Sequence, residues 1–123
     1  MITVTLVEDD ALVREGTEAF LRAAGYLVIA GASGSDLAWK ITESGIRPDV
    51  LLCDYRLGAT TALDAVPEAL NVIKTKVPVI ILTGDSSPDV TAKIQERGWH
   101  RMLKPYTANE LLFMLSQIET RVA

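Results

Sequence analysis

The sequence of 123 residues contains a single cysteine, Cys53, and a single histidine, His100. One cysteine cannot form a disulfide within the chain, and so few soft ligands argue against a zinc site. No apolar run approaches the roughly 18 residues of a membrane span, and a charge as early as Glu8 argues against a signal peptide. We therefore expect a cytoplasmic protein without membrane contact.

Positive charge is also limited and dispersed along the chain. There are 12 Lys and Arg against 16 Asp and Glu, for a formal net charge of -4. Basic residues that form no cluster in the sequence give no indication of a nucleic-acid-binding surface. The apolar fraction of 49% is typical of a globular protein, and the length predicts one domain over residues 1–123.

Apolar residues alternate between strand-like runs and helix-like spacing along the whole chain. We expect strands at 2–7, 26–30, 50–53, 77–82 and 101–103, with a helix after each strand. Such alternation favours right-handed crossovers and a parallel sheet covered on both faces. The predicted fold class is α/β, a flavodoxin-like (βα)5 three-layer sandwich with strand order 2-1-3-4-5.

Local signals indicate where several helices begin. Asp10 can cap the first helix, Ser87-Pro88 starts the fourth, and Thr107 with Glu110 forms a capping box for the fifth. Pro67 fits best in the first turn of the third helix, with Asp64 or a nearby threonine as its cap. The expected apolar faces are Val13, Thr17, Phe20 and Ala24 in the first helix, and Leu111, Leu115, Ile118 and Val122 in the last.

Polar residues follow four of the five expected strands. They are the triplet 8–10 (Glu-Asp-Asp), Asp54, Thr83 with Gly84, and Lys104. Ligands of such sheets bind beyond the carboxyl ends of the strands, where the strand order reverses between the first and third strands. All four signals are therefore expected on one rim of the sheet.

Several carboxylates at one rim repel each other unless some are protonated or a cation lies among them. Oxygen ligands suit a hard ion such as Mg²⁺. The candidate ligands are Glu8 (through water), Asp9, Asp54 and the backbone carbonyl of Arg56. The alternative for residues 8–10 is a solvated turn in which Asp10 caps a helix.

Asp54 is also a candidate nucleophile, because carboxylates form acyl phosphates in known enzyme chemistry. Lys104 would place a positive charge on the phosphoryl oxygens, and Thr83 would donate from its hydroxyl. Each residue alone has an ordinary alternative, a solvated lysine or a common strand-end threonine. Their expected convergence on one rim favours a phosphate-accepting site.

Residues 6–10 (LVEDD), 49–57 (DVLLCDYRL), 79–84 (VIILTG) and 103–105 (LKP) resemble the receiver domain of bacterial two-component response regulators. The resemblance implies that Asp54 accepts a phosphoryl group from a histidine kinase, or exchanges one with a phosphotransfer protein. It also implies that Glu8 and Asp9 hold Mg²⁺ with Asp54, and that Thr83 and Lys104 respond to the phosphate. The sequence is similar, too, to receivers at the C-terminal end of hybrid sensor histidine kinases.

Two positions depart from the family pattern. The loop after Asp54 reads Gly-Ala-Thr-Thr-Ala at 58–62 where a Pro and a Gly are usual, and Arg101 replaces the usual aromatic residue three before Lys104. We expect a charged output surface made by the helix at 88–97, the strand at 101–103 and the last helix. Output would then be by contact with a downstream protein, without direct nucleic-acid binding, and a homodimer is compatible with this interpretation.

Two other functions compete with phosphate acceptance. A receiver-like module could signal through its surface without phosphorylation, although the intact acidic set argues against this. A phosphohydrolase would usually carry an aspartate two residues after its nucleophile, where this chain has Arg56. We therefore predict a signalling domain, not an enzyme, with at most slow self-dephosphorylation.

Five further residues have weaker signals. Arg56 and Asp85 each lie two residues past a proposed site residue. A pair between them would control water access to the site, and the alternative is that they are two solvated loop charges. Because successive side chains of a strand point to opposite faces of the sheet, Cys53 should point away from Asp54 into apolar packing. Buried thiols are usually inert. Trp39 and Trp99 are expected to be packing residues, with Trp99 as a candidate partner anchor.

Overall fold

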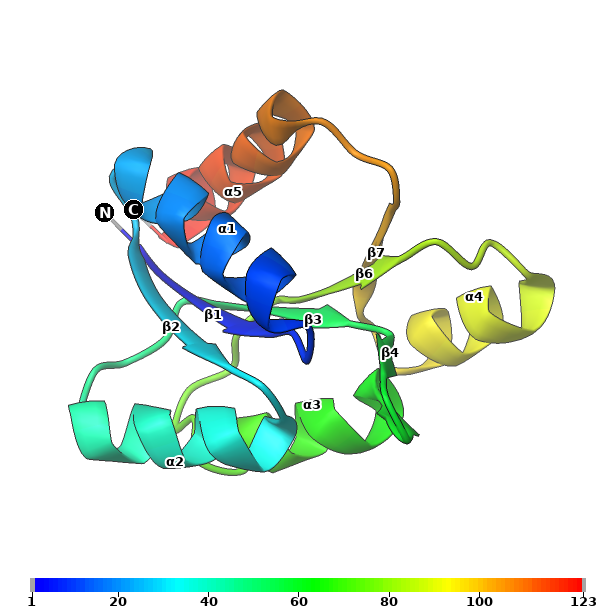
Figure 1. Ribbon diagram of the computed structural model, residues 1–123, viewed down its shortest axis with the longest axis horizontal. Coiled ribbons are helices and arrows are strands. Elements are labelled where there is room, and N and C mark those ends of the chain that lie inside the picture. Colours follow the sequence, from blue (N-terminus) through cyan, green and yellow to red (C-terminus); the bar gives the residue numbers. More distant parts are fainter. Residues whose placement is uncertain (1, 123) are drawn as a thin grey trace.

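A five-stranded parallel sheet forms the centre of the molecule (Figure 1). The computed structural model describes the backbone of residues 2–122 and the side chains of residues 2–121. The strand order β2-β1-β3-β6-β7 is the predicted order 2-1-3-4-5, because a short hairpin takes the labels β4 and β5. The strands are β1 (Thr3–Val7), β2 (Leu27–Gly31), β3 (Val50–Asp54), β6 (Val79–Thr83) and β7 (His100–Leu103).

Helices cover both faces of the sheet, which confirms the three-layer prediction. The helices α1 (Ala11–Ala23) and α5 (Ala108–Val122) pack on one face. The other face carries α2 (Gly34–Ser44), α3 (Ala62–Leu70) and α4 (Pro88–Glu96). Within residues 2–122, none of these helices is long and apolar enough to cross a membrane.

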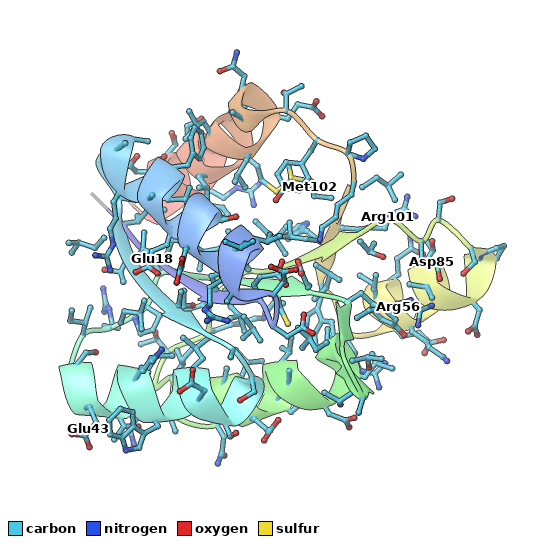
Figure 2. The ribbon with its side chains drawn as sticks, viewed as in Figure 1. Glu18, Glu43, Arg56, Asp85, Arg101 and Met102 are labelled. Carbon is cyan, nitrogen blue, oxygen red and sulfur yellow. The ribbon has the colours of Figure 1, made fainter. Side chains whose placement is uncertain are left out.

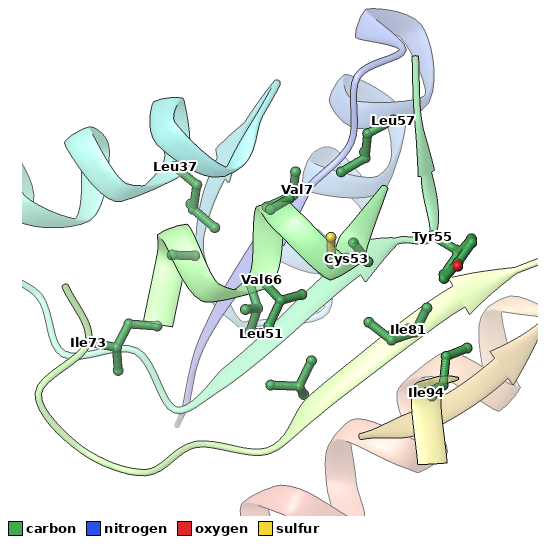
Figure 3. Close-up of a cluster of buried hydrophobic side chains, with 14 of the residues drawn as sticks. Val7, Leu37, Leu51, Cys53, Tyr55, Leu57, Val66, Ile73, Ile81 and Ile94 are labelled. Carbon is green, nitrogen blue, oxygen red and sulfur yellow. The ribbon is translucent and has the colours of Figure 1, made fainter. Parts of the chain in front are cut away.

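Two apolar cores hold the layers together, one on each face. Leu51 and Ile81 point into the core under α2, α3 and α4, whereas their strand neighbours Leu52 and Ile80 point into the core under α1 and α5. Figure 3 shows the first core. A parallel sheet covered on both faces explains why these strands read as continuous apolar runs.

The predicted helix starts are confirmed. Asp10 Oδ1 accepts from the Val13 N–H at 3.1 Å. Thr107 and Glu110 cap each other, because each backbone N–H donates to the other side chain at 3.1 Å. Ser87 caps α4, with Pro88 as its first residue. In α5, Leu111, Leu115 and Ile118 are buried as expected; Val122 lies outside the residues whose side chains are described.

The apolar face predicted for α1 is wrong in part. Val13 is 47% exposed and Ala24 is also exposed, whereas Leu21, which the pattern omitted, is fully buried. Thr17 and Phe20 are half-buried. The first turn of α1 lies beside the polar rim, where Val13 lines a cavity instead of the core.

The expected position of Pro67 is also wrong. Thr61 caps α3, as one of the two alternatives proposed, and its Oγ1 accepts from the Leu63 N–H at 3.2 Å. Pro67 therefore lies in the helix interior, where it removes the donor that would bond the Leu63 carbonyl. The helix persists because Ala65 and Val66 pack into the core, so tertiary burial outweighs the lost bond.

A hairpin of β4 (Arg56–Leu57) and β5 (Thr60–Thr61) was not predicted. The two strands are antiparallel, and Gly58 in the turn has φ +64, a left-handed conformation that suits glycine. The hairpin stands next to the acidic rim, since a Cβ on Gly58 would lie 3.5 Å from Asp9 Oδ2. Two-residue strands have no period to detect, so sequence patterns miss them.

Candidate functional site

Asp54 ends the central strand β3, between β1 and β6. The residue is only 6% exposed. Because β3 pairs along its length with both neighbours, the carboxylate stands on a stiff support. The residues after β1 and at the end of β6 are therefore its neighbours, as the sequence predicts.

The three predicted acidic ligands lie together. One carboxylate oxygen from each of Glu8, Asp9 and Asp54 lies within 4.8 Å of the others. Asp10 does not join them, because its side chain caps α1. Its backbone N–H instead donates to Glu8 Oε2 at 3.1 Å, and Arg14 donates to the Glu8 carbonyl at 2.9 Å.

The crowding of carboxylates changes the protonation of Glu8. Burial, followed by its hydrogen bond with Asp54, raises the pKa of Glu8 from 4.5 to about 7. Negative charge at this rim is therefore not fully compensated by the protein. Closely spaced carboxylate oxygens of this kind are the ligands that hard divalent cations prefer, so the donor set fits Mg²⁺.

Lys104 supplies a positive charge beside Asp54. Its Nζ lies 3.2 Å from Asp54 Oδ1, and its backbone N–H donates to the Thr83 carbonyl at 2.8 Å. Lys104, the residue directly after β7, therefore lies beside the end of β6. An ammonium group at this position can neutralise charge that develops on a group bound to Asp54.

Thr83 ends β6 and is only 4% exposed. Its Oγ1 accepts from the Asp85 backbone N–H at 3.0 Å, which leaves the hydroxyl hydrogen available for donation. Thr83, Asp54 and Lys104 line one cavity of about 730 Å³. The structure thus brings the three predicted reactive residues to one hollow.

Arg56 and Asp85 form the predicted pair at the mouth of this cavity (Figure 2). Arg56 Nη2 lies 3.0 Å from Asp85 Oδ2. Hydrogen bonding from Ser87, with a smaller contribution from Arg56, lowers the pKa of Asp85. The pair joins the loop after β3 to the loop after β6, and both residues line the cavity that contains Asp54.

Tyr106 is a neighbour of the site that sequence reasoning missed. Its half-buried ring lines a second cavity of about 470 Å³, which also reaches Glu8, Asp54 and Lys104. Burial, and then the charge of Asp54, raise the pKa of Tyr106. The available signal was its position two residues after Lys104, in the loop that follows the last strand.

The secondary predictions have mixed outcomes. Cys53 is fully buried in the core, as expected, and burial raises the pKa of its thiol. Arg101 is exposed, and its Nη1 donates to Thr91 Oγ1 on α4 at 2.7 Å. Trp99 packs against the core. Trp39, by contrast, is 63% exposed, so the packing prediction for it is wrong.

Sequence comparison identifies relatives over nearly the whole chain. The transcriptional regulatory protein PdtaR of Mycobacterium tuberculosis is 26% identical over 110 residues, which cover 89% of this chain and 52% of that protein. The cell cycle transcriptional regulator CtrA of Caulobacter vibrioides is 30% identical over 122 residues, covering 96% of this chain and 50% of that protein. The chain thus spans about half the length of these relatives.

Solved structures show the same fold. The chemotaxis protein CheY4 of Vibrio cholerae has a TM-score of 0.82 and 25% identity, covering 96% of this chain and 98% of that chain. A response regulator receiver domain protein from Clostridium thermocellum has a TM-score of 0.83 and 21% identity, covering 98% and 96%. The sequence model of the response regulator receiver domain matches residues 4–116. The chain therefore belongs to the response regulator receiver domains, which act in two-component phosphorelay signalling.

Proposed function

We propose that Asp54 accepts a phosphoryl group from a phosphohistidine on a histidine kinase or phosphotransfer protein, in a Mg²⁺-dependent reaction. The observation that carries this proposal is the setting of one carboxylate. Asp54 lies within a cluster of three carboxylates, and its Oδ1 lies 3.2 Å from the Lys104 ammonium. The cavity in front of it is open to a donor.

In this proposal Glu8 (through water), Asp9, Asp54 and the Arg56 carbonyl hold Mg²⁺, which supplies charge neutralisation when bound. An Asp54 oxygen attacks the phosphorus, and the bond from phosphorus to the histidine nitrogen breaks. The electron pair stays on the imidazole. Lys104 stabilises the phosphoryl oxygens by charge, and the Thr83 hydroxyl donates to one of them.

The chain then acts as a phosphate acceptor and switch, not as an enzyme with turnover. Arg56 occupies the position two residues after Asp54, and its guanidinium is paired with Asp85. A guanidinium stays protonated at all ordinary pH values, so it cannot serve as a general base for water. Self-dephosphorylation is accordingly expected to be slow.

Phosphorylation would be read out on the surface of α4, β7 and α5. A phosphoryl group adds about -1.5 to -2 charge, next to Thr83 and Lys104, which are hydrogen-bonded to each other through their backbones. Arg101 on β7 is bonded to Thr91 on α4, so these elements are coupled. The proposed partner is a downstream protein, and the surface also suits a homodimer.

The proposal includes residues 1–123 as one receiver domain, and a cytoplasmic location. The two cores span strands and helices from both halves of the chain, which supports one folding unit. Cys53 is a free, buried thiol, as is usual in a reducing compartment. The relatives named as transcriptional regulators are about twice as long, so DNA contact is not proposed for this domain itself.

Intact-mass spectrometry after incubation with acetyl phosphate and Mg²⁺ tests the proposal. The parent chain should gain one phosphoryl mass, and Asp54→Asn should gain none. Asp89→Asn is the matched control, because Asp89 is an exposed aspartate on α4 paired only with Lys93, and it should behave like the parent. Equal labelling of Asp54→Asn and the parent, or labelling unchanged by EDTA, would contradict the proposal.

A further inference from the structure

The basic residues that lack polar partners gather at the end of the sheet opposite Asp54. Within residues 2–121, the side chains of Arg47, Lys74, Lys76 and Arg121 form no hydrogen bond or ion pair. Every other Lys and Arg has a partner: Arg14, Arg22, Lys40, Arg56, Lys93, Arg97, Arg101 and Lys104. Residues that are dispersed in the sequence are therefore clustered by the fold.

These four side chains line two cavities on either side of the segment 70–78. Arg47 and Lys74 line one of about 540 Å³, and Lys76 and Arg121 line the other, of about 590 Å³. No described acidic residue lines either cavity. The C-termini of the helices lie at this end of a βα sheet, and a helix C-terminus attracts cations. This attraction explains why basic residues gather here, but it does not explain the two cavities that they line.

The second of these hollows, named here the basic cavity, also has apolar residues in its lining. Val77, Pro78 and the half-buried Trp99 contribute to it. The Arg97 guanidinium lies 5.6 Å from the centre of the Trp99 ring, which holds the indole in place by cation–π attraction. His100, at the start of β7, adds another hydrogen-bonding group to the rim.

The basic cavity therefore offers two complementary features to a ligand. A base can pack against Pro78 and against the part of the Trp99 indole that the core and Arg97 leave exposed to the cavity. Unpaired Lys76 and Arg121 can bind phosphate oxygens without first breaking an internal ion pair. A volume of about 590 Å³ lies within the range of small-molecule sites. The chain as a whole has a net charge of -4, so this positive charge is local.

We propose that the basic cavity binds a nucleotide, with the base against Trp99 and Pro78 and the phosphates among Lys76, His100 and Arg121. The basic residues and the apolar residues line the same cavity. A compact ligand can contact both at once, so it is favoured over an extended acidic peptide. The site is remote from the acidic rim, since it is lined by the first residues of β6 and β7 while Asp54 and Thr83 end their strands. It is therefore independent of the proposed phosphorylation.

Fluorescence titration of Trp99 with ATP tests this proposal. Trp39→Phe makes Trp99 the only tryptophan, and EDTA prevents metal-bridged binding at the acidic rim. ATP should change the emission saturably, tripolyphosphate should bind more weakly, and adenosine should bind weakly or not at all. Raising the salt concentration should weaken ATP binding, because the contacts to phosphate are electrostatic.

Charge-matched variants locate the site. Lys76→Gln with Arg121→Gln should raise the Kd for ATP about tenfold. The control pair Arg22→Gln with Lys40→Gln removes the same charge from other surfaces and should leave the Kd unchanged. Equal losses in both pairs, no saturable response to ATP, or binding of a poly-glutamate peptide in preference to ATP would each overturn the proposal. Phosphorylation by acetyl phosphate serves as the folding check for both pairs.

Discussion

The two ends of the sheet handle charge in opposite ways. At the carboxyl end, charged side chains contact each other: Lys104 touches Asp54, Arg56 touches Asp85, and carboxylates crowd together. At the amino end, the unpartnered basic residues of the two cavities contact no charged group within the described chain. The contrast shows that the charged groups at one end are in contact with each other, whereas the basic groups of the two cavities at the other end have no charged partner within the described chain.

Removal of one carboxylate of the proposed Mg²⁺ site should have the largest effect, and would confine the proposed phosphorylation to one end of the sheet. Asp9→Ala should lower the rate of labelling by acetyl phosphate about a hundredfold at limiting Mg²⁺, because an oxygen ligand is lost. Lys74→Gln at the amino end should not change this rate. Mass spectrometry at several Mg²⁺ concentrations measures both; a full rate for Asp9→Ala would break the comparison.

The pH dependence of stability should reveal the carboxylate crowding. Since the pKa of Glu8 is raised from 4.5 to about 7, the folded state holds a proton that the unfolded state loses in this window. Stability in EDTA should therefore fall as pH rises from 4.5 to 7 and then level off. The loss relative to Glu8→Gln should be about 3 kcal/mol, measured by urea unfolding. Parallel pH profiles for the two proteins would show that Glu8 is not the cause.

The Arg56–Asp85 pair should control the lifetime of the phosphoryl group. Arg56→Ala opens the mouth of the cavity above Asp54, so water gains access and dephosphorylation should be about threefold to tenfold faster. Because the two residues act as one unit, Asp85→Ala should have a similar effect and the double variant should add little. The decay of the phosphorylated mass after removal of the phosphoryl donor gives the dephosphorylation rate of each variant. Fully additive effects of the two single substitutions would show that Arg56 and Asp85 do not act as a pair.

The smallest effects are expected at the amino end. Lys76→Gln and Arg121→Gln remove charges that have no partner within the described chain, so the free energy of unfolding should change by no more than about 0.5 kcal/mol. Relief of repulsion could make the change slightly stabilising. Urea unfolding of each variant, with Lys104→Gln for contrast, tests this; a large loss would show that these residues do have a structural role.

Sequence patterns predicted the strand order and most of the site because both depend on strong local signals. Buried parallel strands are continuous apolar runs, and the residue that ends each run marks the rim, as Asp54 and Thr83 do. The α1 face was misjudged because Val13 is placed by its position at the rim, not by helical period. Pro67 was misplaced because packing of α3 outweighs a local propensity.

The hairpin at 56–61 and the site role of Tyr106 could not be predicted from periodicity. Two-residue strands have no repeat, and Tyr106 nears Glu8 and Asp54 only because β7 lies beside β6. The same reason applies to the basic cavity. Arg121 and Lys76 are 45 positions apart by their residue numbers, yet they line one hollow.

The order of residues alone determined the alternation of strands and helices, the caps, and which residues are candidates for the acidic cluster and for the proposed phosphate contacts. These depend on short-range physics: side-chain period, capping chemistry and the hydrophobicity of buried runs. Tertiary structure decided which distant charges meet, because pairing between strands brings loops to one end or the other. The Lys104–Asp54 contact and the unpaired basic cluster at the opposite end are both products of that pairing.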